Sequence, residues 1–494
     1  MKRIRKRRRT RKRVRFGAPD ESLTGSSGVA ALAELVDRLG VVGLLDGHVG
    51  SVKARDRGVS AGQLLVGLAQ CQLLGGDCLT ALDRQRQDTA AGLLSAVPAI
   101  PSTTAASLAG RFGPEAFAGI ESATAALTGR VFDLLDPARR AALSGGATTI
   151  DMDSTDVEVY GRHKRGVAYN YAGQRAGRPH LATWAEAGLT VAADLLAGND
   201  DVRPRAADLL GRALAALPGP VREQSDRGER WSRVRADAGY FTAELAHAAV
   251  EHGCDFAIAA KRNTAMWRVY AGIDDTEWTP ATGMAGAEVA ACDYAPAGWP
   301  EHTYTIVRRV RVDAEQISAD PRSRRRRTID PDQLALALDG RATHAYAVSF
   351  IVSNIPTGGT GDTGDDRDGG ARLDNAFDRV VDVEAWFRRR TDIEDRIREA
   401  KLGAALRRLP SGDPAVNTVW MWASLLASNL SVWLQALTGL DHAGRAHAAR
   451  LRHQLLCVPA RIIRHARGLT LRLPPGPQLL PIVLARLRRL PLPA

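Results

Sequence analysis

Hydrophobic positions follow a helical period in the first part of the chain. Apolar residues recur three and four positions apart over residues 29–45 and 60–76, each with a glycine where a helix would end. Residues 101–112 open with a typical N-cap sequence and predict a further short helix. This pattern predicts an all-helical region over residues 17–140. Such a region suits reading of the DNA major groove, although a purely structural role explains the same helices equally well.

The period changes to two near residue 147. Residues 148–154 alternate so that Ile150 and Met152 share one face, and Asp151 and Asp153 share the other. Further strands are predicted at 180–196 (a pair around a turn), 231–237 and 255–261, with helices at about 203–216 and 242–253. The order is three strands, helix, strand, helix, strand. That is the order of the ribonuclease-H-like fold, which needs one more helix to close the sheet.

The closing helix does not follow at once. Residues 262–380 hold more strand-like runs and predict a β-rich insertion, and a long helix is then predicted from about residue 382 to 405. The Gly- and Asp-rich stretch 357–372 lacks the ligand spacing of an EF-hand and predicts a flexible, solvated loop. We therefore expect an α/β protein. It has a ribonuclease-H-like catalytic core with a β-rich insertion, preceded by an all-helical N-terminal DNA-binding domain.

The expected division of the chain follows these changes of pattern. Its parts are a disordered basic tail (1–16), the helical DNA-binding domain (17–140), the first part of the core (147–261), the β-rich insertion (262–380), the second part of the core with the closing helix (381–440) and a C-terminal segment (441–494).

Positive charge is concentrated at the N-terminus. The chain has 494 residues and a formal net charge of +12, and residues 1–16 carry eleven Lys or Arg and no acid. Because these eleven charges account for all but one of the twelve, the rest of the chain is nearly neutral. A basic tail on a neutral body predicts a polyanionic partner that the tail contacts first, and nucleic acid is the simplest such partner.

Composition narrows the class of protein further. With 45% hydrophobic and 25% charged residues, the chain has the profile of an ordinary globular protein with more than one domain. Five scattered cysteines without zinc-ligand spacing predict free thiols in a reducing cytoplasm. The most apolar stretch, residues 416–440, contains Asn417, Asn429 and Gln435, and it predicts a buried helix and not a membrane span.

Acidic residues at strand ends are the first candidates for chemistry. Phosphodiester chemistry on this fold needs carboxylates that hold two divalent ions about 4 Å apart. Mg²⁺ prefers such hard oxygen ligands. The strands offer Asp151 and Asp153 side by side, and Asp237 at the end of a strand just before a turn. An exposed edge strand and an ordinary turn residue are the structural explanations of the same acids, and the alternation does not choose between Asp151 and Asp153.

The predicted helix at 382–405 offers a third acid. At 100° per residue, Phe387, Arg390, Glu394 and Lys401 fall within about a 60° wedge beside an apolar stripe. Glu394 is the acid that borders this buried seam, with a basic residue on each side. Lys401 is one of four lysines beyond the tail in a chain that mostly uses Arg. A compact ammonium there favours a role as a point charge for phosphate.

These residues resemble a known family. The spacing Phe387-x2-Arg390-x3-Glu394-x6-Lys401 resembles the Tyr-Arg-Glu-Lys signature of a group of bacterial insertion-sequence transposases. Asp153-Ser154-Thr155 is similar to the first-Asp motif of that group, and residues 235–241 (RADAGYF) are similar to its second. The likeness is greatest to the insertion-sequence family numbered thirteen-eighty. Phe387 departs from the signature because it lacks the tyrosine hydroxyl, and the Ser-Thr after Asp153 favours Asp153 over Asp151.

The resemblance implies a DDE transposase with a defined site. The catalytic and metal-binding residues would be Asp153, Asp237 and Glu394, with Mg²⁺ as cofactor and Mn²⁺ able to replace it, and the DNA-binding residues would be Phe387, Arg390 and Lys401. Such an enzyme cuts DNA at the terminal inverted repeats of its element and joins the freed 3′-hydroxyl ends to target DNA. The implied partners are double-stranded DNA and a second copy in a homodimeric end-bound complex. The implied location is the bacterial cytoplasm, at the nucleoid, and no membrane is involved.

Two other functions fit parts of the sequence. One is a transposase-derived DNA-binding protein without catalysis, which the intact acids disfavour. The other is a ribonuclease-H-like nuclease without strand transfer, which would not need a large helical region that binds DNA ends. An α/β enzyme acting on small molecules finds no support, because the sequence has no GxGxxG after a strand, no Walker lysine loop and no GxSxG.

Overall fold

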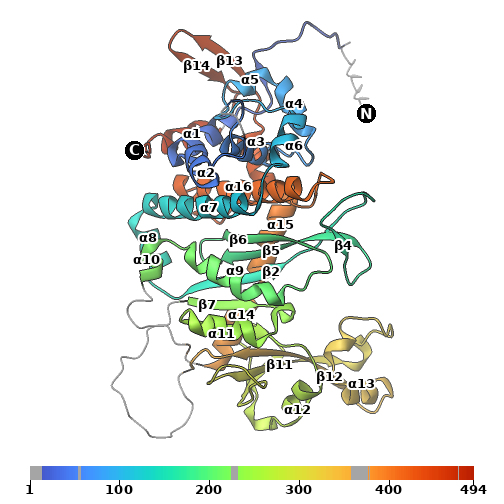
Figure 1. Cartoon of the computed structure of the whole chain (residues 1–494). Coiled ribbons are helices and arrows are strands. Elements are labelled where there is room, and N and C mark those ends of the chain that lie inside the picture. Colours follow the sequence, from blue (N-terminus) through green and yellow to red (C-terminus); the bar gives the residue numbers. More distant parts are fainter. Residues whose placement is uncertain are drawn as a thin grey trace, which may run out of the picture.

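The computed structural model describes residues 14–53, 57–223, 232–357, 377, 379–476 and 478–493. Figure 1 shows an elongated molecule. Helices gather at one end, a large sheet crosses the middle, and the strands of the insertion lie at the other end. Most of the predicted basic tail and of the predicted Gly- and Asp-rich loop lie outside the described residues.

Five strands form the centre of the sheet. They are β2 (Thr148–Ser154), β5 (Arg175–Trp184), β6 (Leu189–Ala197), β7 (Ser232–Ala236) and β8 (Cys254–Ala259). In space they run β6, β5, β2, β7, β8. The β6–β5 and β5–β2 pairs are antiparallel, whereas β2, β7 and β8 are parallel to one another. Their mostly buried, β-branched and small apolar residues suit a covered sheet. Along the chain, these five strands and the helices between them come in the order that the sequence predicts for a ribonuclease-H-like core.

Helices pack against these strands. α9 (Arg203–Ala215) and α11 (Ala243–Glu251) contact each other and the strands β5, β6 and β8. α15 (Thr391–Gly403) contacts β2, and the long α16 (Pro414–Thr438) contacts both β6 and α15. α16 is largely buried, as the apolar stretch at 416–440 predicts. Neither α16 nor any other helix in the described ranges has the length and hydrophobicity that a bilayer crossing requires.

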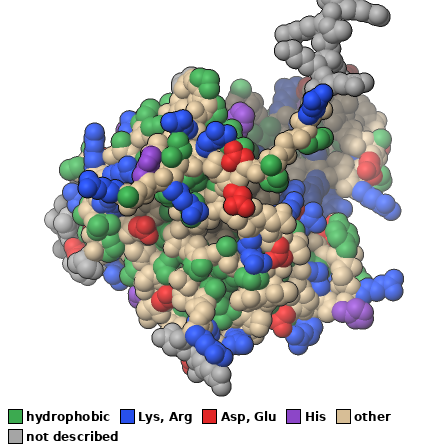
Figure 2. Space-filling view, turned by 90° about the horizontal axis from the view of Figure 1, so that it is seen from above, with side chains coloured by type: hydrophobic (Ala, Val, Ile, Leu, Met, Phe, Trp, Pro, Cys, Tyr) green, Lys and Arg blue, Asp and Glu red, His purple; other side chains and the backbone are tan. Residues whose placement is uncertain are grey.

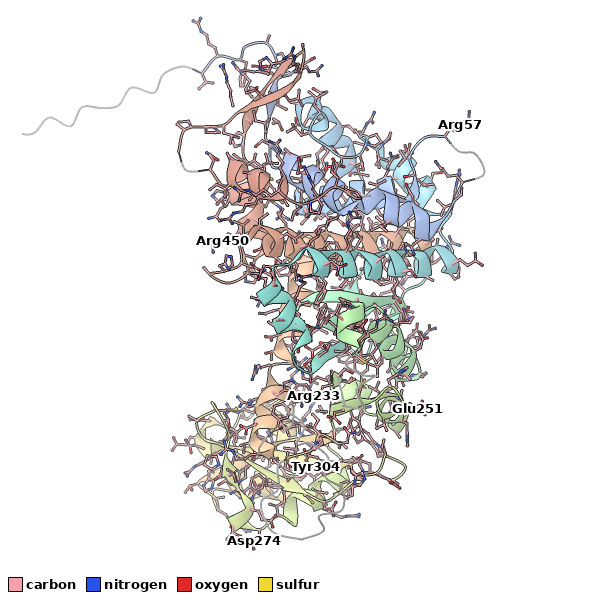
Figure 3. The ribbon with its side chains drawn as sticks, turned by 90° about the vertical axis from the view of Figure 1, so that its left-hand side faces the viewer. Arg57, Arg233, Glu251, Asp274, Tyr304 and Arg450 are labelled. Atoms are coloured by element: carbon pink, nitrogen blue, oxygen red, sulfur yellow. The ribbon has the colours of Figure 1, made fainter. Side chains whose placement is uncertain are left out.

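The insertion extends the same sheet. β12 (His344–Ser353) lies antiparallel to β8, and β11 (Tyr304–Asp313), β10 (Ala287–Cys292) and β9 (Thr279–Pro280) follow in antiparallel order. α12 (Thr264–Ala271) and α13 (Pro331–Leu338) pack against β12. Figure 3 shows this part at the lower end of the molecule, with Tyr304 and Asp274 in it and Arg233 where the core meets it. The insertion is therefore joined to the core by backbone hydrogen bonds.

The N-terminal part of the chain is mainly helical. Its helices are α1 (Val29–Leu39), α2 (Val41–Val49), α3 (Ala61–Leu73), α4 (Ala81–Gln87), α5 (Thr89–Gly92), α6 (Ser102–Ala109), α7 (Pro114–Leu134) and α8 (Pro137–Ser144). α3 and α7 pack directly on α16. Their buried side chains belong to one hydrophobic core that continues into the central sheet.

The C-terminal segment completes this helical layer. It contains α17 (Ala448–Leu451), a π-helical turn (Arg452–Leu456), β13 (Ala460–His465), β14 (Gly468–Arg472) and α18 (Leu479–Leu487). β13 pairs with β14 and with the short N-terminal strand β1 (Leu23–Thr24), and α18 packs on α1. The prediction of an all-helical N-terminal domain is therefore not confirmed, because a strand belongs to that region and distant segments share its core.

The prediction of one long helix over residues 382–405 is wrong, because the segment forms two helices. α14 (Val380–Arg388) ends at a turn and α15 begins at Thr391. Glu384 of α14 is fully buried and lies 2.7 Å from Arg308 of β11 and 3.0 Å from Arg388. The pair with Arg308 holds α14 against the insertion, and the pair with Arg388 lies within α14. α15 instead packs against β2 and α16. The break lets one segment of chain follow two different surfaces.

Candidate active site

Three predicted carboxylates meet at the ends of β2 and β7. Asp153 is the penultimate residue of β2, and Asp237 directly follows β7. Because β2 and β7 are parallel neighbours with Met152 opposite Ala236, the two aspartates stand side by side. Glu394 lies in the first turn of α15, the helix that packs against β2. Two adjacent strands and one helix therefore bring the three acids to the same end of the sheet.

Arg390 lies between two of these carboxylates. Its Nη1 is 3.3 Å from Asp153 Oδ2, and its Nη2 is 3.4 Å from Glu394 Oε1. Burial raises the pKa of Asp153 to about 6; Arg390 opposes that shift, whereas the charges of Asp237 and Glu394 add to it. The Asp153 side chain is 14% exposed and that of Glu394 is 58% exposed. The acids thus interact electrostatically, with Asp153 enclosed and Glu394 open to solvent.

Local backbone structure orients Asp237. Its Oδ1 accepts a hydrogen bond from the amide of Gly239 at 2.8 Å and begins the short 3₁₀ helix Ala238–Tyr240. A Cβ at residue 239 would lie 2.9 Å from that oxygen, so glycine permits the contact. Tyr240 is buried beside the acids. Burial raises the pKa of its hydroxyl well above the usual value, and Asp153 and Asp237 act in the same direction. Sequence reasoning gave Tyr240 no role, although it belongs to the 235–241 motif.

Asp151 is engaged by a different partner. Its carboxylate accepts hydrogen bonds from Arg235 Nε at 2.6 Å and Nη2 at 2.8 Å, and both side chains are buried. Arg235 also donates from Nη1 to the backbone oxygen of Trp386 at 2.6 Å and lies over its indole ring. One buried arginine therefore links β2, β7 and α14. This engagement favours Asp153 as the first acid of the site.

The remaining two residues of the predicted wedge have other surroundings. Phe387 is the penultimate residue of α14 and packs against the hydrophobic cluster of the insertion, because the helix break separates it from α15. Lys401 Nζ donates to Thr155 Oγ1 at 2.6 Å and to the backbone oxygen of Asp156 at 2.9 Å. Lys401 therefore fixes the segment that directly follows Asp153.

The three carboxylates suit a divalent cation by their chemistry. They are hard oxygen donors, and the guanidinium between Asp153 and Glu394 shows that this position attracts positive charge. Within the described ranges, no group of three or more His, Cys, Asp or Glu side chains is spaced to hold a metal ion. The donor types suit a hard divalent cation, and in this structure Arg390 bridges Asp153 and Glu394.

The raised pKa of Asp153 makes the metal-free protein sensitive to pH. Between about pH 4 and 6 the folded state keeps this proton while the unfolded chain loses it, so the free energy of unfolding falls as pH rises through that window. We expect Asp153→Asn to remove this loss and to stabilise the protein at pH 7.5 by up to about 3 kcal/mol. Thermal unfolding in EDTA at pH 4 and 7.5 measures the effect. An equal gain at both pH values would contradict it.

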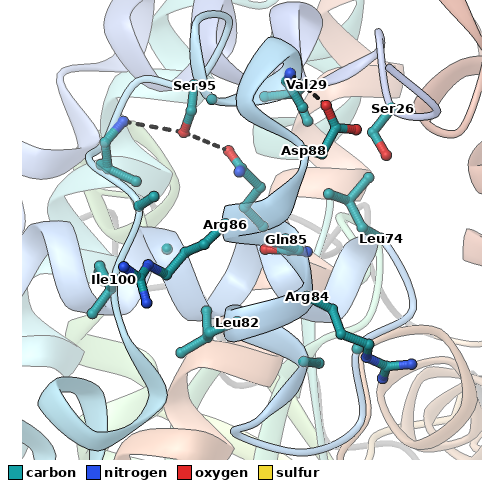
Figure 4. Close-up of a pocket in the computed structure, with 18 of the residues that line it drawn as sticks. Ser26, Val29, Leu74, Leu82, Arg84, Gln85, Arg86, Asp88, Ser95 and Ile100 are labelled. Atoms are coloured by element: carbon teal, nitrogen blue, oxygen red, sulfur yellow. Dashed lines mark hydrogen bonds between the residues drawn. The ribbon is translucent and has the colours of Figure 1, made fainter. Parts of the chain in front are cut away.

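A cavity of about 330 Å³ lies elsewhere, among α3, α4 and α5 (Figure 4). Arg84 and Arg86 line it, and the Ser95 hydroxyl donates to Gln70 Oε1 at 3.1 Å on its wall. None of the three carboxylates lines this cavity. The candidate active site is therefore the open end of the sheet and not the cavity among the N-terminal helices.

Comparison with known proteins gives one extensive match. A family model described as transposase DDE domain group 1 matches residues 6–320 and 376–492. Among solved structures, the cryo-EM structure of a piggyBac transposase synaptic complex with hairpin DNA aligns with a TM-score of 0.41 at 8% identity. That alignment covers 86% of this chain and 79% of the other. The search of curated protein sequences finds no significant match.

Proposed function

The chain belongs to the transposase DDE domain group 1 family, and from this premise we propose that it is an insertion-sequence transposase that cuts DNA at terminal inverted repeats and joins the 3′-hydroxyl ends to target DNA. The observation that carries the proposal is the meeting of Asp153, Asp237 and Glu394 at one end of the sheet. We further propose that it belongs to the insertion-sequence family numbered thirteen-eighty, on its Phe-Arg-Glu-Lys spacing.

The roles of the residues follow from their places in the fold. Asp153, Asp237 and Glu394 would hold Mg²⁺, or Mn²⁺ in its place. Divalent ions held there would supply activation of the attacking oxygen and stabilisation of the leaving oxygen. Asp153, as the enclosed acid, must lose its proton before it can serve as a ligand. Arg390 compensates the acids in the metal-free protein and is suited to bind a phosphate beside them.

Contacts to DNA would extend beyond the acids. We propose Lys401 and Arg390 as phosphate contacts near the cut and Phe387 as an apolar contact at the turn between α14 and α15. Figure 2 shows Lys and Arg side chains spread over the face built by the N-terminal helices and the C-terminal hairpin, with acids between them. Because cations and acids are mixed on this face, we propose that it positions a DNA end by specific contacts, together with the basic tail. We also propose that the complex with the DNA ends is a homodimer.

The test is an end-cleavage assay on the full chain. The substrate is a labelled duplex that carries the inverted repeat found in the DNA flanking the gene, incubated with Mg²⁺ and a supercoiled target plasmid. We expect nicked ends and joined products, both abolished by EDTA. Cleavage without joined products would identify a nuclease instead. Specific binding of the repeat without cleavage would identify a DNA-binding protein that has lost catalysis.

Lys401 provides a separate prediction. Lys401→Met should lower end cleavage about 10- to 100-fold, because the segment after Asp153 loses two charge-assisted hydrogen bonds and the bound strand loses a cation. Lys401→Arg should restore it only in part, since a planar fork replaces a point charge. Lys261→Met, at an exposed lysine, is the matched control and should cleave normally. If Lys401→Met cleaves DNA ends as the wild type does, Lys401 neither positions the segment after Asp153 for cleavage nor contacts a phosphate near the cut.

A further inference from the structure

A hairpin arm projects from the side of the core between β2 and β5. It comprises residues 157–175, with the short strands β3 (Val157–Glu158) and β4 (Ala168–Tyr169), which pair with the outer end of β5. Figure 1 shows the arm around β4 reaching beyond the sheet and its covering helices. We call residues 157–175 the β3–β4 arm.

The arm exposes three aromatic rings. Tyr160 is 82% exposed, Tyr169 69% and Tyr171 89%. Elsewhere in the described ranges, Phe16 is the one aromatic residue that is similarly exposed. Aromatic side chains normally contribute their large apolar faces to cores or interfaces. Their concentration within twelve residues of one projecting element indicates a binding surface for flat, unsaturated groups.

The rings are interleaved with positive charge. The arm contains three Arg, one Lys and one acid, Glu158, whose carboxylate accepts a hydrogen bond from the Tyr160 hydroxyl at 2.9 Å. Arg175 donates to three backbone oxygens of residues 161–164 at 2.6–2.7 Å, and Lys164 donates to two backbone oxygens of residues 409–411. These contacts hold the arm in a defined shape. Arg165 pairs with Asp413 at 2.8 Å. Arg175 and Lys164 contact carbonyl oxygens, which do not neutralise them, so the arm keeps a net positive charge that suits a phosphate chain.

The surface beside the arm is concave on two sides. A groove of about 1150 Å³ is lined by Tyr160, Lys164, Arg407 and Arg408, among others, and by Asp77, which pairs with both arginines. A shallower hollow of about 630 Å³ is lined by Tyr169, Arg162 and Arg175, among others. Each concavity therefore combines a tyrosine ring with cations, which is the combination that binds a base and its phosphate together.

The base of the arm is tied to the candidate active site. The arm begins four residues after Asp153, which is about 13 Å along an extended strand. Lys401 holds the intervening Thr155 and Asp156 against α15, the helix that carries Glu394. A DNA strand cut at the three acids would therefore pass close to the arm.

We propose that the β3–β4 arm binds unpaired nucleotides of the DNA next to the cleavage site, with bases stacked on Tyr160, Tyr169 and Tyr171. The proposal rests on the proposed function and adds the form of DNA that this surface takes. Inside a duplex the faces of the bases are covered by their neighbours, so away from the duplex ends an exposed ring finds a base face only where nucleotides are unpaired or turned out of the stack. The cations of the arm would hold the phosphates of the same strand.

Binding to two forms of one DNA tests the proposal. The probes are a duplex with a single-stranded thymidine overhang and the same duplex with blunt ends, each labelled and titrated with the full chain in EDTA. We expect the triple variant Tyr160→Ala, Tyr169→Ala, Tyr171→Ala to bind the overhang probe about tenfold or more weakly and the blunt probe unchanged. The matched triple Tyr→Phe variant keeps the rings and should bind both probes as the wild type does.

Three outcomes would overturn the proposal. Wild-type binding of the overhang probe by the alanine variant would show that the rings make no contact. Equal weakening on both probes would show that the arm binds duplex DNA. A change in oligomeric state would assign the rings to a second copy of this chain. No cleavage is needed in this assay, so a wild-type protein that prefers the overhang but never cuts would overturn the proposed function and leave the arm proposal standing.

Discussion

Glu394→Gln should reduce end cleavage by about three powers of ten or more while leaving the fold intact. The loss follows because a metal-binding carboxylate contributes several kcal/mol to stabilising charge in the transition state, and each 1.4 kcal/mol is tenfold in rate. The fold should tolerate the change because the side chain is 58% exposed and Arg390 keeps its contact to Asp153. Cleavage of a labelled end in Mg²⁺ and binding of the same DNA in EDTA give the two readouts.

The neighbouring acid on the same helix is a matched control. Asp395 is 55% exposed and pairs with Arg398 at 2.9 Å, so it has similar exposure and the same helical context. Asp395→Asn should cleave and bind as the wild type does. If Glu394→Gln cleaves normally, or if both variants lose cleavage equally, Glu394 is not the third acid and the assignment made from the Phe-Arg-Glu-Lys spacing is wrong.

The central sheet could be predicted because its signal is local. Period-two alternation marked the strands, and the order of strands and helices left few topologies for connections of normal handedness. The helix break at residues 389–390 could not be predicted, because both residues are arginines with good helix propensity. The helices on the two sides of the break differ in their tertiary contacts: Glu384 of α14 is held by Arg308, which lies 76 residues away in the chain, whereas α15 packs against β2.

The candidate site shows the same division between local and distant information. Alternation placed Asp151 and Asp153 on one face, so no periodic argument could separate them. They differ because Arg235 of β7 donates two hydrogen bonds to the carboxylate of Asp151 in the neighbouring strand β2. The helical wheel grouped Arg390, Glu394 and Lys401 correctly, because all three belong to α15 or its N-cap. It misplaced Phe387, because that residue lies in the last turn of a different helix, α14.

The core that the N-terminal helices share with distant segments of the chain also could not be predicted from the local sequence pattern. Helical spacing predicted helices over residues 29–45, 60–76 and 101–112, and it gave no sign that β1 would pair with β13, more than four hundred residues away. Burial of one apolar face by a distant segment depends on the complete fold. Pairing between chain ends therefore has to be read from the structure.

Arg235→Met should lower the free energy of unfolding by about 3–5 kcal/mol, because it leaves the carboxylate of Asp151 buried without its partner. Burial already raises the pKa of Asp151 to about 6, and Arg235 opposes that rise. Its removal should therefore raise the pKa further and make the loss of stability greater at pH 8 than at pH 5. Denaturant unfolding at the two pH values measures both effects.

A double variant separates stability from positioning. Arg235→Met with Asp151→Leu removes both charges, and replacement of a whole buried ion pair by apolar residues is commonly neutral or stabilising. Stability should then return to near the wild-type value. Cleavage should stay low, because the hydrogen bond from Arg235 to the Trp386 backbone oxygen ties α14 to the strands that carry the acids, and that bond remains absent. Full recovery of both stability and cleavage would show that Arg235 serves the fold alone. Low cleavage at restored stability would identify it as a positioning residue for the three carboxylates.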